Sequence, residues 1–157
     1  MAIEKWVAGS GVGFTWTAAF GAEYTTTTCA STSAVASSVV ITNQTALDVF
    51  CDISFHFAAV TTVGSPFIGV YLYPLNQDAS TYGDGRFASA AAGPPPSNYC
   101  VGNIGVPVLT TTAGNGSLVG IVMPPGSFKF VFYNGLGVAT AASGNTSGYR
   151  TYNISVA

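Results

Sequence analysis

The chain has 157 residues, of which 48% are hydrophobic and only 6% are charged, and its formal net charge is -2. This composition excludes intrinsic disorder, which requires low hydrophobicity and high charge, and the length suits one domain. Four Lys and Arg residues are too few to build a basic face, so nucleic acid and an anionic membrane surface are disfavoured as partners.

Residues 1–32 are rich in Gly, Ala and Thr, and they are predicted to form an extended N-terminal arm. The arm also carries aromatic residues, and four of them are the candidates for a partner interface: Trp6, Phe14, Trp16 and Phe20. Two interpretations stay open. The arm becomes ordered on a neighbouring molecule, or it folds back as the first strand of its own domain.

Residues 33–157 are predicted to form a β-sandwich domain, because apolar residues alternate with polar ones at a period of two. The alternation is clearest in residues 48–57 and 128–133. Further strand candidates, rich in Val, Ile, Tyr and Phe, are residues 37–42, 66–73, 117–123 and 149–156. Many short strands separated by turn residues indicate an all-β, antiparallel β-sandwich or jelly roll.

The segments between these strands carry turn residues. Asn43-Gln44-Thr45 is predicted to turn a hairpin, and Gly114-Asn115-Gly116 is predicted to form a turn. Residues 88–99 end in Pro94-Pro95-Pro96, which cannot lie in a central strand, so they are predicted to form a long ordered surface connection.

The residues that could support catalysis are few. Asp52, Ser54 and His56 share the polar face of one predicted strand, where side chains two residues apart run parallel about 6.5–7 Å from each other. They therefore do not converge on one proton as a catalytic triad must, and the sequence predicts a solvated or interface-facing strand. An esterase or lyase would require His56 in a pocket beside a carboxylate from another strand.

Cysteine and histidine spacing does not fit a structural zinc site, and the three cysteines, Cys29, Cys51 and Cys100, are expected to be reduced thiols. We expect no metal, no cofactor and no enzymatic activity. The Asn-X-Ser/Thr triplets, such as Asn43-Gln44-Thr45 and Asn145-Thr146-Ser147, are interpreted as chance products of a Ser/Thr-rich chain.

A surface with so few charges suits close contacts with other proteins, because obligate interfaces are depleted in charge. The composition therefore predicts a protein that assembles with partners. A carbohydrate-binding module is the alternative, with a cleft lined by Tyr71, Tyr73, Tyr82 and Tyr99.

Several segments resemble small structural proteins of tailed phages and prophages. They are Phe67-Ile68-Gly69-Val70-Tyr71-Leu72-Tyr73, Asn76-Gln77-Asp78, Tyr82-Gly83-Asp84-Gly85, Met123-Pro124-Pro125-Gly126, Phe128-Lys129-Phe130-Val131 with Asn134, Gly144-Asn145-Thr146 and Tyr149-Arg150-Thr151-Tyr152-Asn153. The resemblance extends over most of residues 14–153 and brings no catalytic residue with it.

The resemblance implies a virion component, and within that class a capsid decoration or cement protein. Such a protein is synthesised in the host cytoplasm, binds the major capsid protein on the outside of the head as a homotrimer, and stabilises the shell by bridging capsomers. A tail or fibre component is the alternative within the same class. Fold alone does not separate these roles.

Overall fold

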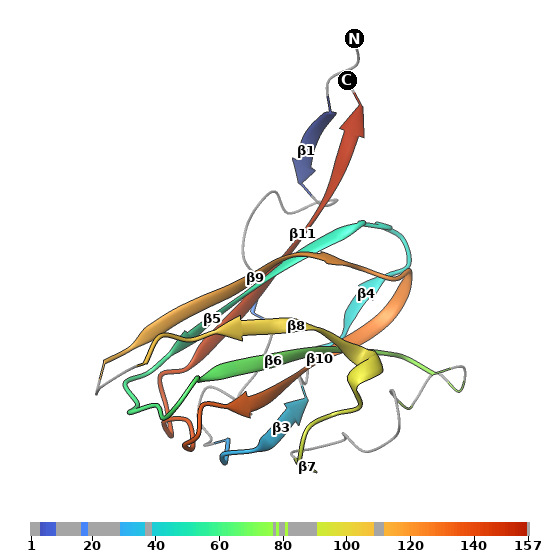
Figure 1. The fold of residues 1–157 in the computed structure, drawn as a ribbon. Helices are drawn as coiled ribbons and strands as arrows, with labels where there is room; N and C mark the ends of the chain where they lie inside the picture. Colours follow the sequence, from blue (N-terminus) through green and yellow to red (C-terminus); the bar gives the residue numbers. More distant parts are fainter. Residues whose placement is uncertain are drawn as a thin grey trace.

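The computed structural model describes residues 4–8, 17–18, 29–36, 39–76, 78, 81, 91–108 and 112–156. The described residues form two antiparallel sheets that face each other, so the predicted all-β sandwich is confirmed (Figure 1).

Strand order is the feature that the sequence did not provide. Sheet A runs β1 (Glu4–Ala8), β11 (Thr146–Val156), β5 (Phe50–Phe57) and β9 (Gly114–Val122), and β2 (Thr17–Ala18) also pairs with β11. Sheet B runs β7 (Ala91–Ala92), β3 (Ser33–Ala36), β10 (Gly126–Gly135), β6 (Phe67–Pro74) and β8 (Cys100–Gly105), and β4 (Ile41–Asn43) also pairs with β10. A 3-10 turn, η1, spans Ser97–Tyr99.

The core lies between the sheets and follows the period-two pattern. Cys51, Ile53, Phe55 and Phe57 of β5 are buried against the alternate apolar side chains of sheet B. The ring of Phe55 lies 5.0 Å from that of Phe132 in an edge-on arrangement that joins the two sheets. Burying each such side chain stabilises the fold by about 1.5–3 kcal/mol.

The predicted hairpin at residues 43–45 is wrong. β4 belongs to sheet B and β5 to sheet A, so residues 44–49 cross from one sheet to the other rather than reverse a hairpin. The crossing is held by the side chain of Asn43, whose amide donates to the Asp48 carbonyl and whose oxygen accepts from the Asp48 N–H, both at 2.8 Å.

The predicted turn at residues 114–116 is also wrong, because these residues begin β9. Glycine is required here for close approach rather than for a turn. A Cβ at Gly116 would collide with the buried side chain of Ile104 on β8, the strand that lies beside β9 in the other sheet.

The predicted surface connection, residues 88–99, contributes to sheet B in its described part. Ala91–Ala92 pair with β3, and the Gly93 N–H donates to the Thr32 carbonyl at 2.8 Å. Pro95 is buried, so this segment packs against the domain.

The predicted arm, residues 1–32, contains two described strands. β1 and β2 both pair with β11 of the same chain, and the remaining described arm residues are 29–32. β11 extends beyond its partner β5: β5 pairs with it as far as Tyr152, whereas β1 pairs with Tyr152 through Val156. Figure 1 shows β1 and this end of β11 projecting from the sandwich as a two-stranded ribbon.

Candidate interaction surface

The row of polar residues on β5 lies on the outer face of sheet A, but Asp52 is not solvated. It is 3% exposed, and its carboxylate accepts hydrogen bonds from the Tyr152 hydroxyl at 2.8 Å and the Gly120 N–H at 2.9 Å. Arg150, directly opposite on β11, forms an ion pair with it at 2.9 Å. The sequence predicted a solvated or interface-facing strand. The first alternative is wrong at Asp52, because cross-strand partners cover this residue, and the second stays a prediction.

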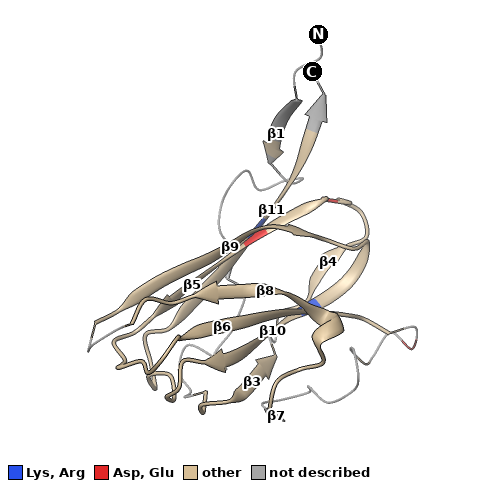
Figure 2. Cartoon of the chain, in the orientation of Figure 1, with Lys and Arg blue, Asp and Glu red and all other residues tan. Residues whose placement is uncertain are grey.

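Figure 2 shows how few charges the described chain carries. Red and blue meet where β5 and β11 run side by side, which is where Asp52 and Arg150 neutralise each other. This part of the outer face therefore presents little net charge to a partner.

His56 lies four residues from Asp52 and has a different partner. Its ring Nδ1 lies 2.7 Å from the side-chain oxygen of Asn115 on β9. Asp52 and His56 thus make separate hydrogen bonds. Among the described residues, no three His, Cys, Asp or Glu side chains gather as a metal site would require.

The electrostatics of the Asp52 cluster act on Tyr152. Burial, then the hydrogen bond to Asp52 and the charge of that carboxylate, raise the pKa of Tyr152 to about 12. Burial also raises the pKa of the Cys29 thiol to about 11 and, with the nearby Asp52 charge, that of Cys51 to about 12. These two thiols are held neutral, whereas Cys100 is exposed.

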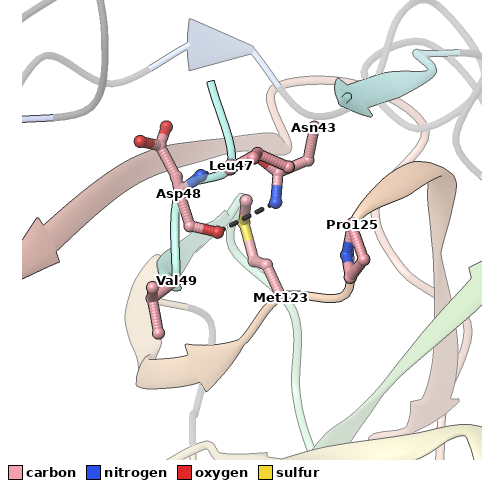
Figure 3. Close-up of a pocket in the computed structure, with 6 residues that line it drawn as sticks. All are labelled: Asn43, Leu47, Asp48, Val49, Met123 and Pro125. Atoms are coloured by element: carbon pink, nitrogen blue, oxygen red, sulfur yellow. Dashed lines mark hydrogen bonds between the residues drawn. The ribbon is translucent and has the colours of Figure 1, made fainter. Parts of the chain in front are cut away.

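A shallow hollow lies at the end of the sandwich where residues 44–49 cross between the sheets (Figure 3). Its volume is about 260 Å³, and its lining is Asn43, Leu47, Asp48, Val49, Met123 and Pro125. Sites for small molecules usually enclose about 300–1,000 Å³ and surround the ligand. The hollow is smaller and open, so it suits an apolar side chain of another protein better than a small-molecule ligand.

The rim of the hollow is apolar and rigidly held. Leu47 is 56% exposed and adopts φ 49°, a left-handed conformation that costs a non-glycine residue about 1–2 kcal/mol. Asn43 holds the loop through its hydrogen bonds to Asp48. Asn153 of β11 holds it from the other sheet: its side chain accepts from the Val49 N–H at 2.7 Å and donates to the Asp48 carboxylate at 2.8 Å. The fold thus maintains a strained loop that exposes a leucine to solvent.

Sequence reasoning missed this rim. The alternation over residues 48–57 puts Val49 on the apolar face of the predicted strand, whereas the structure leaves Val49 45% exposed. What the sequence did not reveal is that Asn153, about a hundred residues away along the chain, also binds this segment.

The structure describes three of the four tyrosines proposed for a sugar cleft. Tyr71 and Tyr73 are buried in a second apolar cluster with Ala34 and Val131, on the outer side of sheet B. Tyr73 stacks on Tyr99 with ring centroids 4.5 Å apart. Tyr82 lies outside the described residues. The rings of Tyr71 and Tyr73 therefore do not line an open cleft.

The four aromatic candidates of the arm remain predictions. Phe14, Trp16 and Phe20 lie outside the described residues. The backbone of Trp6 is in β1, directly opposite Ile154 of β11, and its side chain lies outside the described part of the structure.

Within the described residues, no helix has the length and apolar character needed to cross a membrane. Comparisons of the chain with protein-family models, with curated proteins and with solved structures find no match.

Proposed function

We propose that this chain is a virion structural protein, a capsid decoration protein that attaches to the outside of a phage head as a homotrimer and stabilises the shell. The sequence resemblance to structural proteins of tailed phages motivates the assignment. The observation that supports it is the loop held by the Asn43 and Asn153 side chains, which exposes Leu47 and Val49 beside a hollow. The chain around this loop carries few charges.

The attachment mechanism is the sum of several small contacts. One apolar loop tip and one hollow per subunit supply a weak interface, but copies joined in one oligomer bind the shell together. The second and third contacts then form at high effective concentration, and the net attachment is tight. Bridging of neighbouring capsomers by one oligomer is what stiffens the shell.

The test is co-sedimentation of the purified protein with empty heads of the phage whose genome encodes it. The informative variant is Leu47→Asn, because asparagine tolerates a left-handed backbone and the substitution removes the apolar side chain without straining the loop. Val63→Asn is the matched control, because Val63 is also an exposed apolar residue outside the strands. We expect Leu47→Asn to weaken attachment and Val63→Asn to leave it unchanged.

The arm residues are tested in the same assay. Substitution of Phe14, Trp16 and Phe20 by serine is expected to weaken attachment, whereas deletion of residues 1–12 would also remove β1.

Three results would contradict the proposal. Wild-type protein that does not sediment with heads argues against decoration, and immunogold label confined to the tails of purified virions would assign the protein to the tail. Specific binding of the isolated protein to a glycan array would favour the carbohydrate-binding alternative.

A further inference from the structure

One end of the outer face of sheet A exposes apolar side chains, beyond the polar residues of β5 that share this face. Val119 and Val122 of β9 are strongly exposed, and Ile154 of β11 is partly exposed. Val122 pairs with Phe50, and Phe50 stacks on Tyr152 with ring centroids 5.7 Å apart, so these residues lie on one face. Because Cys51 and Ile53 point into the core, this face is the one turned away from the sandwich interior.

The same face continues onto the projecting ribbon. Opposite residues of an antiparallel pair share a face, so the register places Ile154 with Trp6, and Tyr152 with Ala8, at positions on the outer side. The positions between them pair Val7 with Asn153. The ribbon is thus a two-stranded extension whose outer-face positions are apolar from Tyr152 to Ile154.

The ribbon is incomplete by itself. Two-stranded ribbons are marginally stable in water, and their unpaired edges bind further strands. Beyond Tyr152, β11 has β1 as its strand partner on one side, and on the other side the Asn153 side chain binds Val49. In the described chain, no strand lies against Ile154–Val156 on that second edge, nor against the outer edge of β1.

Charge indicates which kind of partner fits. On the outer face of sheet A, the charged side chains that the structure describes are Asp52 and Arg150, and they are paired with each other. The register also puts Glu4, opposite Val156, at an outer position near the end of the ribbon. A strongly acidic or basic partner would meet no row of opposite charges there, whereas a second nearly uncharged face would lose few solvated ions on contact. An identical copy of this chain provides such a face together with an identical ribbon.

We propose that the ribbon and the outer face of sheet A join copies of this chain into a cyclic homo-oligomer. In this arrangement the outer edge of β1 pairs with Ile154–Val156 of the neighbouring copy, and the apolar faces turn toward the symmetry axis. Because β1 and β11 are antiparallel, a ring with its axis along the ribbons makes every neighbouring pair antiparallel. The ring leaves no ribbon edge open, whereas a two-fold pair of β1 strands would leave both β11 edges open.

The inference deepens the proposed function, and it rests on that function for the expectation that copies associate as a trimer. The inference and the proposed function concern different surfaces. Head attachment is assigned to the Leu47 rim, and self-association is assigned to Val122 and Ile154.

The experiment measures molar mass by light scattering after size exclusion over a series of protein concentrations. Val122→Asp and Ile154→Asp introduce a charge into the proposed interface, and Val108→Asp is the matched control, since Val108 is 64% exposed against 67% for Val122 and follows β8 in the other sheet. We expect an oligomer for wild type and Val108→Asp. Each interface variant should raise the dissociation constant by at least about tenfold.

A second variant keeps the test decisive if a charge prevents folding. Val122→Thr keeps the shape and the strand propensity, and it must still weaken association, with an unchanged circular dichroism spectrum.

Wild type that is monomeric at every concentration would overturn the inference, as would interface variants that keep the wild-type mass. A monomer that still binds heads would overturn the inference alone, and an oligomer that dissociates as expected but never binds heads would overturn the proposed function alone.

Discussion

Replacing Asp52 by alanine tests the central electrostatic feature of the fold. The substitution removes the acceptor of the Tyr152 hydroxyl, the Gly120 N–H and the Arg150 guanidinium at once. Because these donors come from β9 and β11, the carboxylate holds three neighbouring strands of sheet A together.

The three lost contacts do not count equally. Tyr152 is buried, so loss of the carboxylate that accepts from its hydroxyl costs about 1–3 kcal/mol. The Arg150 side chain is 32% exposed and stays hydrated, so loss of the ion pair costs only about 1 kcal/mol. Gly120 is exposed and its N–H can bind water, at a cost of about 0.5 kcal/mol. Asp52→Ala should therefore lower the free energy of unfolding by about 3 kcal/mol.

Urea denaturation at a fixed protein concentration measures this loss. With a slope of about 2 kcal/mol/M, the midpoint should fall by about 1.5 M. Repeating Asp52→Ala in a Tyr152→Phe background isolates the hydroxyl, and the loss there should be about half as large. An equal loss in both backgrounds, or a loss below about 1 kcal/mol in wild type, would refute the assignment of the main effect to Tyr152.

Three further predictions concern packing, thiols and alkaline pH. Gly116→Ala should lower the free energy of unfolding by about 1–3 kcal/mol in thermal melts, because its Cβ meets a buried side chain, while Gly105→Ala, whose Cβ meets nothing, should change it by less than half as much. A disulfide-exchange reagent should label Cys100 quickly and the two buried cysteines only after unfolding; rapid labelling of all three would contradict their burial. The fold keeps Tyr152 neutral by raising its pKa from 10.0 to about 12, so this stabilisation is complete below pH 10 and is lost as the pH rises toward 12. Asp52→Asn should lower that pKa in a spectroscopic titration because it removes the carboxylate charge, and an unchanged value would count against the Asp52 carboxylate as a cause beside burial.

The sequence predicted those strands that bury one whole face. β5 and β10 alternate apolar and polar residues because one side of each meets the core, and both were found within a few residues of the expected bounds. β8 was missed because Ile104 is the buried residue of that strand, which leaves no alternation to detect.

Long-range pairing could not be predicted from local pattern. Asp52 occupies a polar position of its strand, as expected, but its burial depends on Arg150 and Tyr152, which are about a hundred residues away in the chain. The Leu47 rim likewise depends on a side chain contributed by β11. The candidate surface therefore became visible only after the strand order was known.

The side-chain amides that hold loops in this fold also limit how the protein can be produced. Asn43 and Asn145 both begin Asn-X-Ser/Thr triplets, and both side chains are buried and donate to backbone carbonyls. An oligosaccharide on either nitrogen would replace one of its two N–H donors, and the fold could not enclose the sugar. Passage through a eukaryotic secretory pathway, where such triplets are modified before folding is complete, would therefore trap the chain in an unfolded form, and bacterial cytoplasmic expression avoids that outcome.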